Sequence, residues 1–286
     1  MTDIKMLRSA YHQQICGKII RITERDGKKY PNFADGGSLT STKIAWGILE
    51  HLQYARNPES ISGQTSGGRF EVLTCNFLEA AFNLLRPLRP GEWRYSTRLT
   101  ISQFDQYRHL EELEAIVRED DTLASALGLD YIVKPDILVG RVPVSDAQLN
   151  AEGVLLDAKT HLASLTPLRA ANSTSPLPIL HASISCKWTL RSDRGQNART
   201  EALNLIRNRK GRAPHIVVVT AEPMPTRLAT LALGTGDLDC VYHFALNELH
   251  AVVAEMRNED QLEMLNLLID GRRLRDISDL PFDLAI

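Results

Sequence analysis

The sequence predicts an α/β protein in which a mixed central sheet is flanked by helices and preceded by a helical N-terminal part. Two observations support this prediction. Apolar residues recur at helical spacing through the first third of the chain, and short continuous apolar runs alternate with helical patterns in the second half. A run such as His215–Thr220 is typical of a strand that is buried on both faces at the centre of a sheet.

Helical patterns dominate the first half. Phe70, Leu73, Phe77 and Ala81 recur every three or four residues and so share one helical face, with Ser66 as the candidate N-cap. The same reasoning predicts further helices over Asp3–Arg21, Ser41–Ala55 and His109–Leu127.

Strand patterns dominate the second half. The predicted strands are Tyr131–Gly140, Gly153–Asp157, Leu180–Leu190, His215–Thr220 and Asp239–Ala245. The predicted helices are Asn197–Lys210, which Gly211 and Pro214 terminate, Asn247–Arg257 and Glu259–Ile269. Since no clear break separates these elements, residues 1–286 are predicted to form a single domain.

The composition is that of a globular protein, with 43% hydrophobic and 24% charged residues. A net charge of −2 means that any contact with nucleic acid must depend on local basic patches. The four cysteines are widely spaced without a C-x-x-C pair, which argues against a zinc site and a disulfide framework. No signal-peptide core or membrane span is recognisable, so the sequence predicts a cytoplasmic protein with no membrane partner.

Residues suited to phosphodiester hydrolysis lie in or near the predicted strands. Asp136 follows Pro135 and can bind Mg²⁺, which prefers oxygen ligands. Lys187 lies near the end of a strand pattern and can hold an attacking water, while the neighbouring Cys186 can offer its carbonyl to a metal. Glu201 stands 14 residues after Lys187 on a predicted helix and can supply a second acid.

A second lysine competes for the catalytic assignment. Asp157-Ala158-Lys159 lies 21 residues after Asp136 and fits the usual Pro-Asp … Asp/Glu-x-Lys nuclease pattern. In Ser185-Cys186-Lys187, by contrast, Ser185 occupies the acidic position. Only Lys187 is followed by a cluster that can recognise bases, and spacing alone leaves both assignments open.

That cluster consists of Arg191, Asp193 and Arg194, which precede the predicted helix. Arginine pairs bidentately with guanine O6 and N7, and aspartate accepts a hydrogen bond from cytosine N4. The three residues therefore suit a sequence of G·C pairs read in the major groove. The ordinary alternative is a solvated charged turn.

The segment His181–Arg212 resembles the CCGG family of type II restriction endonucleases. In that family the second acid has moved from the strand to the following helix, as Ser185 and Glu201 would have it here. The resemblance therefore favours Lys187 over Lys159 and implies a restriction-endonuclease-like fold, a variant of the PD-(D/E)XK type. It extends over most of the chain and includes Gly63–Gly67, Pro135–Ile137, Pro214–Pro223 and Asp276–Pro281.

Catalytic roles follow from the resemblance, residue by residue. Asp136 would bind two Mg²⁺ ions, with the Cys186 carbonyl completing a site. Lys187 would orient the water, and Glu201 and Glu71 would act nearby. For Glu71 the alternative is a first-turn acid that the helix dipole favours.

The resemblance also implies a set of DNA contacts. Arg191, Asp193 and Arg194 would read the central CCGG, Asp35 and Arg227 the outer G·C pair, and Gln64 the minor groove. Asp35 has a strong alternative, because Ala34-Asp-Gly-Gly is ordinary turn chemistry.

The expected function is Mg²⁺-dependent hydrolysis of both strands of double-stranded DNA at a G·C-only palindrome, GCCGGC by resemblance, leaving 5′-phosphate ends. A palindrome requires at least a two-fold dimer, and the family implies a homotetramer built as a dimer of dimers. A cognate methyltransferase would be a functional partner. The alternatives are a structure-specific or repair nuclease of the same fold and a non-catalytic DNA-binding protein.

Overall fold

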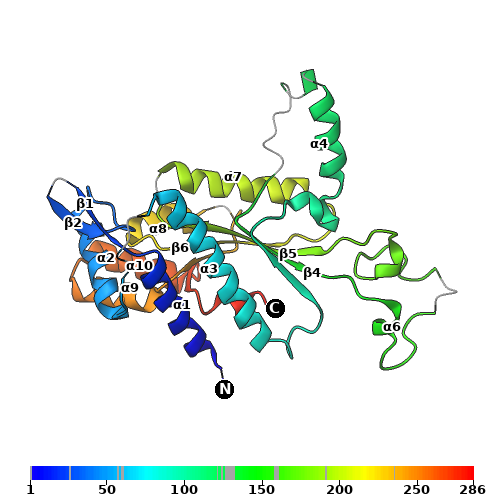
Figure 1. The fold of residues 1–286 in the computed structure, drawn as a ribbon, viewed down its shortest axis with the longest axis horizontal. Coiled ribbons are helices and arrows are strands. Elements are labelled where there is room, and N and C mark those ends of the chain that lie inside the picture. The colour runs from blue at the N-terminus through cyan, green and yellow to red at the C-terminus, as the bar shows by residue number, and fades with distance from the viewer. Residues whose placement is uncertain are drawn as a thin grey trace. The chain divides into compact units, whose positions relative to one another are not determined.

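The computed structural model describes residues 2–25, 27–56, 58, 61–120, 122–123, 125, 133–157, 161–190, 192–234 and 236–286. Within these ranges, six strands form a mixed sheet in the order β3-β4-β5-β6-β7-β8, and β1 and β2 form a separate hairpin. Helices flank the sheet (Figure 1), which confirms the predicted α/β class. The chain groups into two compact units, a larger one of Met1–Leu88, Ile184–Ala202 and Ile216–Ile286, and a smaller one of Arg89–Ser183 and Leu203–His215.

The smaller unit contains an antiparallel strand pair, β3 (Trp93–Ser96) and β4 (Ile137–Arg141), in which Trp93 lies opposite Arg141. β4 begins later than predicted. Pro135 is buried just before β4, where a residue without a backbone N–H is tolerated because it need not donate to a neighbouring strand. Asp136 follows it in a bend and is half-buried. The other elements are η1 (Ile101–Gln103), η2 (Asp105–Tyr107), α4 (His109–Glu119), α6 (Asp146–Leu149) and η3 (Ala170–Asn172).

The strand predicted over Gly153–Asp157 is wrong. The side chain of Asn150 satisfies this backbone in place of a neighbouring strand: its Oδ1 accepts from the N–H groups of Leu155 and Leu156, each at 2.9 Å. Its Nδ2 donates to the Leu156 carbonyl at 2.9 Å. The apolar side chains that suggested a strand are exposed, Val154 by 86% and Leu155 by 70%.

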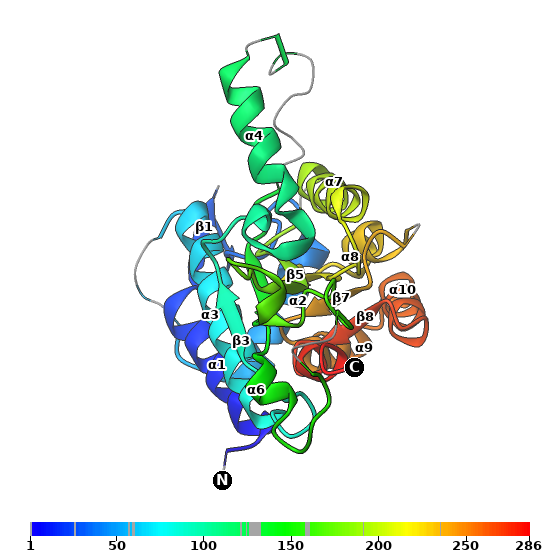
Figure 2. The same ribbon diagram turned by 90° about the vertical axis from the view of Figure 1, so that its right-hand side faces the viewer.

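The larger unit carries helices on both sides of its strands. Figure 2 shows α1 and α3 on one side and α8 and α10 on the other. Its parallel strands pair β7 with β6 and with β8. The strands are β1 (Ile22–Arg25), β2 (Lys28–Pro31), β6 (His215–Thr220), β7 (Cys240–His243) and β8 (Leu274–Asp276). The helices are α1 (Ile4–Lys18), α2 (Leu39–Leu52), α3 (Gly63–Leu84), α8 (Pro225–Ala232), α9 (Leu246–Glu255), α10 (Glu259–Asp270) and α11 (Leu280–Asp283).

Three of the described elements contribute residues to both units, namely β5 (Ile179–Lys187), α7 (Ser192–Asn208) and, through His215 alone, β6. β5 was predicted to run to Leu190 but ends at Lys187. α7 begins five residues before the predicted Asn197, because Ser192 and Asp193 are residue types that favour the start of a helix.

α3 confirms the predicted apolar face, since Phe70, Leu73, Phe77 and Ala81 are all buried. The predicted cap is wrong. Ser62 caps the helix, its Oγ accepting from the Thr65 N–H at 3.0 Å, and Ser66 lies within the first turns. The earlier start is possible because Gly63, Gly67 and Gly68 continue the helix rather than breaking it.

A buried ion network joins α1, α9 and β8. The Arg8 guanidinium donates to both carboxylate oxygens of Glu248, at 2.8 and 2.7 Å, and to both of Asp276, also at 2.8 and 2.7 Å. Burial by itself would raise the pKa of each carboxyl, but the hydrogen bonds and charge of Arg8 outweigh it and lower both pKa values. Both acids are therefore held as carboxylates.

None of the helices in the described ranges has the length and apolar character that a membrane span requires. The four cysteines are buried thiols. Burial raises the pKa of the Cys75 and Cys240 thiols to about 11, so both are protonated at neutral pH.

Candidate active site and base-reading pocket

The carboxyl end of β5 is anchored by Trp188, which directly follows Lys187. The indole is buried and packs edge-on against Phe33 at 5.8 Å and Phe70 at 5.2 Å between ring centroids. Phe244 lies 6.2 Å away in a tilted arrangement. Because these rings come from three separate segments of the larger unit, the backbone at Lys187 is held from several sides.

The last three residues of β5 are Ser185, Cys186 and Lys187. Ser185 and Cys186 are buried and Lys187 is partly exposed. Because the Cys186 side chain is buried, any contribution of this residue to a site would come from its backbone carbonyl.

Glu201 reaches β5 from α7. Ala198 and Ala202 are buried and turn this part of the helix inward, while Glu201 itself is half-buried. The Ser185 hydroxyl donates to Glu201 Oε2 at 3.3 Å. A helix carboxylate therefore stands beside the strand position that is acidic in the usual nuclease pattern.

Glu71 belongs to the same unit and is half-buried on α3. It follows Phe70, whose ring contacts Trp188. Since α3 starts at Gly63, Glu71 lies beyond the first turn, where the helix dipole has little effect. The alternative reading of Glu71 as a first-turn acid is therefore wrong.

Asp136 belongs to the smaller unit, where it directly precedes β4. In the competing motif, Ala158 and Lys159 lie outside the described residues, and the strand expected to carry Asp157 is absent from residues 153–157. The strand that the competing motif requires is therefore absent from its described part, residues 153–157.

The cluster expected to read the central bases is only partly described. Arg191 lies outside the described residues, and for Asp193 and Arg194 the structure gives the backbone alone. These two residues lie in the first turn of α7 rather than before the helix, which corrects the sequence-based expectation.

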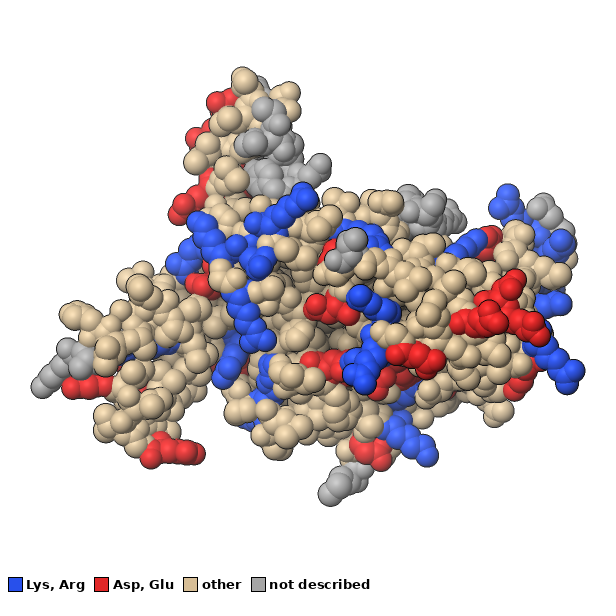
Figure 3. Space-filling model, turned by 180° about the vertical axis from the view of Figure 1, so that it is seen from behind, with Lys and Arg blue, Asp and Glu red and all other residues tan. Residues whose placement is uncertain are grey.

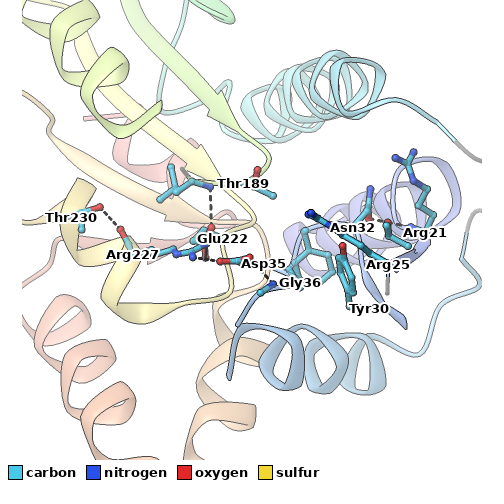
Figure 4. Close-up of a pocket in the computed structure, with 15 residues that line it drawn as sticks. Arg21, Arg25, Tyr30, Asn32, Asp35, Gly36, Thr189, Glu222, Arg227 and Thr230 are labelled. Atoms are coloured by element: carbon cyan, nitrogen blue, oxygen red, sulfur yellow. Dashed lines mark hydrogen bonds and ion pairs between the residues drawn. The ribbon is translucent and has the colours of Figure 1, made fainter. Parts of the chain in front are cut away.

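A pocket of about 780 Å³ in the larger unit brings Asp35 and Arg227 together (Figure 4). These residues are 192 positions apart, yet Arg227 Nη2 donates to Asp35 Oδ2. Their side chains are 38% and 36% exposed, so solvent and ligand can reach both. The pocket thus unites the acceptor and the donor expected for an outer G·C pair.

The turn that carries Asp35 also has a structural role. Asp35 Oδ1 accepts from the Gly37 N–H at 2.9 Å, as the turn alternative predicts. A Cβ on Gly36 would lie 2.3 Å from Tyr30 Cζ, so a larger residue would require the Tyr30 ring to move. One oxygen of Asp35 thus shapes the turn while the other faces Arg227.

Sequence reasoning missed Glu222, which lies in this pocket and is 1% exposed. Its Oε2 accepts from the Leu190 N–H at 3.0 Å, and its Oε1 accepts from the Met224 N–H at 3.2 Å and lies 3.9 Å from Arg227 Nη1. Burial raises the pKa of Glu222 to about 7. Its position just after β6, at the carboxyl end of a parallel strand where ligands commonly bind, is a signal that could have identified it.

The remaining predicted contact, Gln64, is exposed in the first turn of α3. Near the same pocket, the β1–β2 hairpin carries Arg25, Lys28 and Lys29, and Figure 3 shows basic side chains over it at the right of the view. Arg21 and Arg25 line the pocket. Local positive charge is therefore present despite the net charge of −2.

Comparison with known proteins gives concordant results. A family model described as NgoMIV restriction enzyme matches residues 11–286. The type II restriction enzyme NgoMIV of Neisseria gonorrhoeae is 46% identical over 284 residues, which cover 98% of this chain and 97% of that protein. Among solved structures, a PspGI–substrate DNA complex matches at 17% identity and a TM-score of 0.35, covering 77% of this chain and 60% of that one. Bse634I with cognate DNA matches at 15% identity and a TM-score of 0.38, covering 85% of this chain and 98% of that one.

By its identity and coverage with NgoMIV, this chain belongs to the NgoMIV family of type II restriction enzymes, the site-specific deoxyribonucleases that its sequence motifs predict.

Proposed function

We propose that this enzyme hydrolyses both strands of double-stranded DNA at a G·C-only palindrome containing CCGG, with GCCGGC as the full site. The products carry 5′-phosphate and 3′-hydroxyl ends. One observation carries the catalytic part of this proposal: the Ser185 hydroxyl donates to Glu201 at the end of β5. This contact is what a relocated second acid requires, because metal binding depends on where the carboxylate oxygens lie and not on which element carries them.

The reaction is proposed to depend on Mg²⁺, with two ions per active site. No group of three or more His, Cys, Asp or Glu side chains suited to a metal gathers within the described part of the chain. The donor set nevertheless fits Mg²⁺, which takes oxygen ligands and keeps several waters. Asp136 and the Cys186 carbonyl would hold it, with Glu201 and Glu71 acting through waters. Bound Mg²⁺ would neutralise phosphate charge and make a bound water more acidic.

Each remaining residue has a role in the proposed reaction. The Lys187 ammonium holds the attacking water and stabilises its hydroxide form. Ser185 keeps the Glu201 carboxylate in place through its hydrogen bond. Trp188 excludes solvent behind this strand end and limits movement of Lys187, because it is buried among aromatic rings.

Base recognition is proposed to come from two groups of residues. Arg191, Asp193 and Arg194 read the central CCGG from the start of α7. Arg227 donates to the outer guanine and Asp35 accepts from its cytosine partner, which is the pairing that their donor and acceptor groups allow. Gln64 contacts the minor groove.

We further propose that the enzyme works in the cytoplasm as a homotetramer of two dimers, beside a methyltransferase that protects host sites. Cysteines kept as thiols are consistent with a reducing compartment. A two-fold dimer would place one active site on each strand of a palindrome. Light scattering with bound DNA measures the assembly.

The function is tested by digesting a sequenced plasmid with Mg²⁺ and mapping the ends. Wild type should give discrete fragments at GCCGGC. Lys187→Ala should bind DNA without cutting it, and Lys159→Ala, the matched control, should cut normally. Cleavage only at junctions would indicate a structure-specific nuclease, and binding without cleavage a non-catalytic protein. An inactive Lys159→Ala beside an active Lys187→Ala would overturn the assignment of the active site.

A further inference from the structure

Glu222 connects two parts of the recognition machinery that are far apart in the sequence. Its Oε2 accepts from the backbone of Leu190, three residues after Lys187 and directly before the proposed CCGG-reading cluster. Its Oε1 faces the guanidinium of Arg227 on α8 at 3.9 Å. Because Glu222 is almost fully buried and also accepts from the Met224 N–H, it cannot swing away when ligand enters the pocket.

The charges around Arg227 show what this carboxylate can do. Arg227 lies between two acids, with Nη2 bonded to Asp35 and Nη1 facing Glu222 (Figure 4). In the proposed complex, Asp35 must turn one oxygen to cytosine N4 and so weakens its bond to Arg227. Glu222 then remains as the fixed counter-charge that keeps the guanidinium aimed at guanine.

We propose that Glu222 is a positioning residue for specificity: it holds Arg227 for the outer base pair and, through Leu190, ties that contact to the segment bearing Lys187. The inference rests on the proposed function, since it presumes that Arg227 reads the outer pair. Glu222 itself touches no base.

A pH effect follows from the surroundings of this group. Glu222 faces Arg227 and Asp35, while Arg21 and Arg25 line the same pocket from the β1–β2 region. His243 of β7 contacts the Glu222 backbone, but burial lowers its pKa to about 4, so it stays neutral near pH 7. Since burial raises the pKa of Glu222 to about 7, its carboxylate is present above pH 7 and is lost as pH falls below it. Outer-pair preference should therefore be strongest above pH 7.

The test measures relative kcat/KM on duplexes that share a CCGG core and carry each of the four outer pairs. For the wild type, the ratio of kcat/KM on the G·C outer pair to kcat/KM on the other outer pairs should fall about tenfold between pH 8 and pH 6. A change of this size is on the scale of one bidentate base contact. Taking the ratio between duplexes cancels titrations that affect every substrate alike. Glu222→Gln should show the reduced preference at both pH values, whereas Glu263→Gln, the same change at an exposed acid of α10, should behave as wild type.

A double-mutant comparison separates positioning from general support of the fold. In an Arg227→Gln background, Glu222→Gln should cause no further loss of outer-pair preference. An equal loss in both backgrounds, or a wild-type preference that does not change with pH, would overturn the inference. A wild type that prefers an outer pair other than G·C would refute GCCGGC as the site, while the effect of Glu222→Gln on that preference would still decide the role of Glu222. A wild type with no outer-pair preference would refute both.

Discussion

Removing Glu201 and returning an acid from the strand tests the relocated carboxylate directly. Glu201→Ala should abolish cleavage or raise the Mg²⁺ concentration it requires, because the acid beside Ser185 is lost. Adding Ser185→Glu should restore part of the activity. Ser185 Oγ lies 3.3 Å from Glu201 Oε2. A glutamate at position 185 carries its oxygens about 2.4 Å beyond the Oγ position, given bond lengths of about 1.5 and 1.2 Å.

The returned carboxylate should therefore miss the original position by about 1 Å, and a displacement of that size can cost about a hundredfold in rate. We expect the double variant to cut about a hundredfold more slowly than wild type, yet faster than Glu201→Ala. The assay is the single-turnover cleavage rate across a Mg²⁺ series, with Thr200→Ala, an exposed neighbour on α7, as the control. If Glu201→Ala matches wild type throughout the series, Glu201 is a structural helix residue and the reasoning fails.

Two further predictions concern stability and binding. Arg8→Met leaves two carboxylates facing each other in a largely buried site and should cost about 3–5 kcal/mol. Calorimetry should show this as a Tm lowered by roughly 6–10 °C. The control Lys29→Ala, which removes the exposed ion pair with Glu24, should leave the Tm unchanged. Because Arg8 lowers the pKa of Glu248 and Asp276, its stabilisation is complete above about pH 4.3 and is lost as pH falls through the lowered pKa values. A stability difference between wild type and Arg8→Met that does not shrink as the pH is lowered below 4 would contradict this. Arg194→Ala should weaken binding to GCCGGC by about 1–3 kcal/mol more than binding to random duplex. Equal losses in a fluorescence titration would show that Arg194 contacts only phosphate.

The sequence predicted the elements whose patterns arise from burial. β6 matches its predicted bounds. The apolar face of α3 is buried as expected, because apolar residues repeated at helical spacing over a long segment indicate a helix and its buried face. The Gly153–Asp157 strand failed for a tertiary reason, since the Asn150 side chain took the place of a neighbouring strand. The short elements β1, β2, β3 and β8 were missed because three or four residues carry too little periodicity.

The candidate site, too, could be predicted from the sequence only in part. Spacing alone could not choose between Lys159 and Lys187, and the decision came from a family resemblance. The structure adds the Ser185–Glu201 contact, which depends on the packing of α7 against β5 and has no local signature. Glu222 was missed because a single acid after a strand is ordinary in sequence; only its burial beside Arg227 distinguishes it.

The aromatic packing around Trp188 has a consequence for the cell that makes this enzyme. The ring that follows Lys187 rests on Phe33, Phe70 and Phe244, which are synthesised far apart in time. A nascent chain still lacking Phe244 lacks one of the rings that support Trp188, next to Lys187. Under the proposed function, we therefore expect cleavage to require nearly the whole polypeptide, and chains that end before Phe244 to cut little DNA.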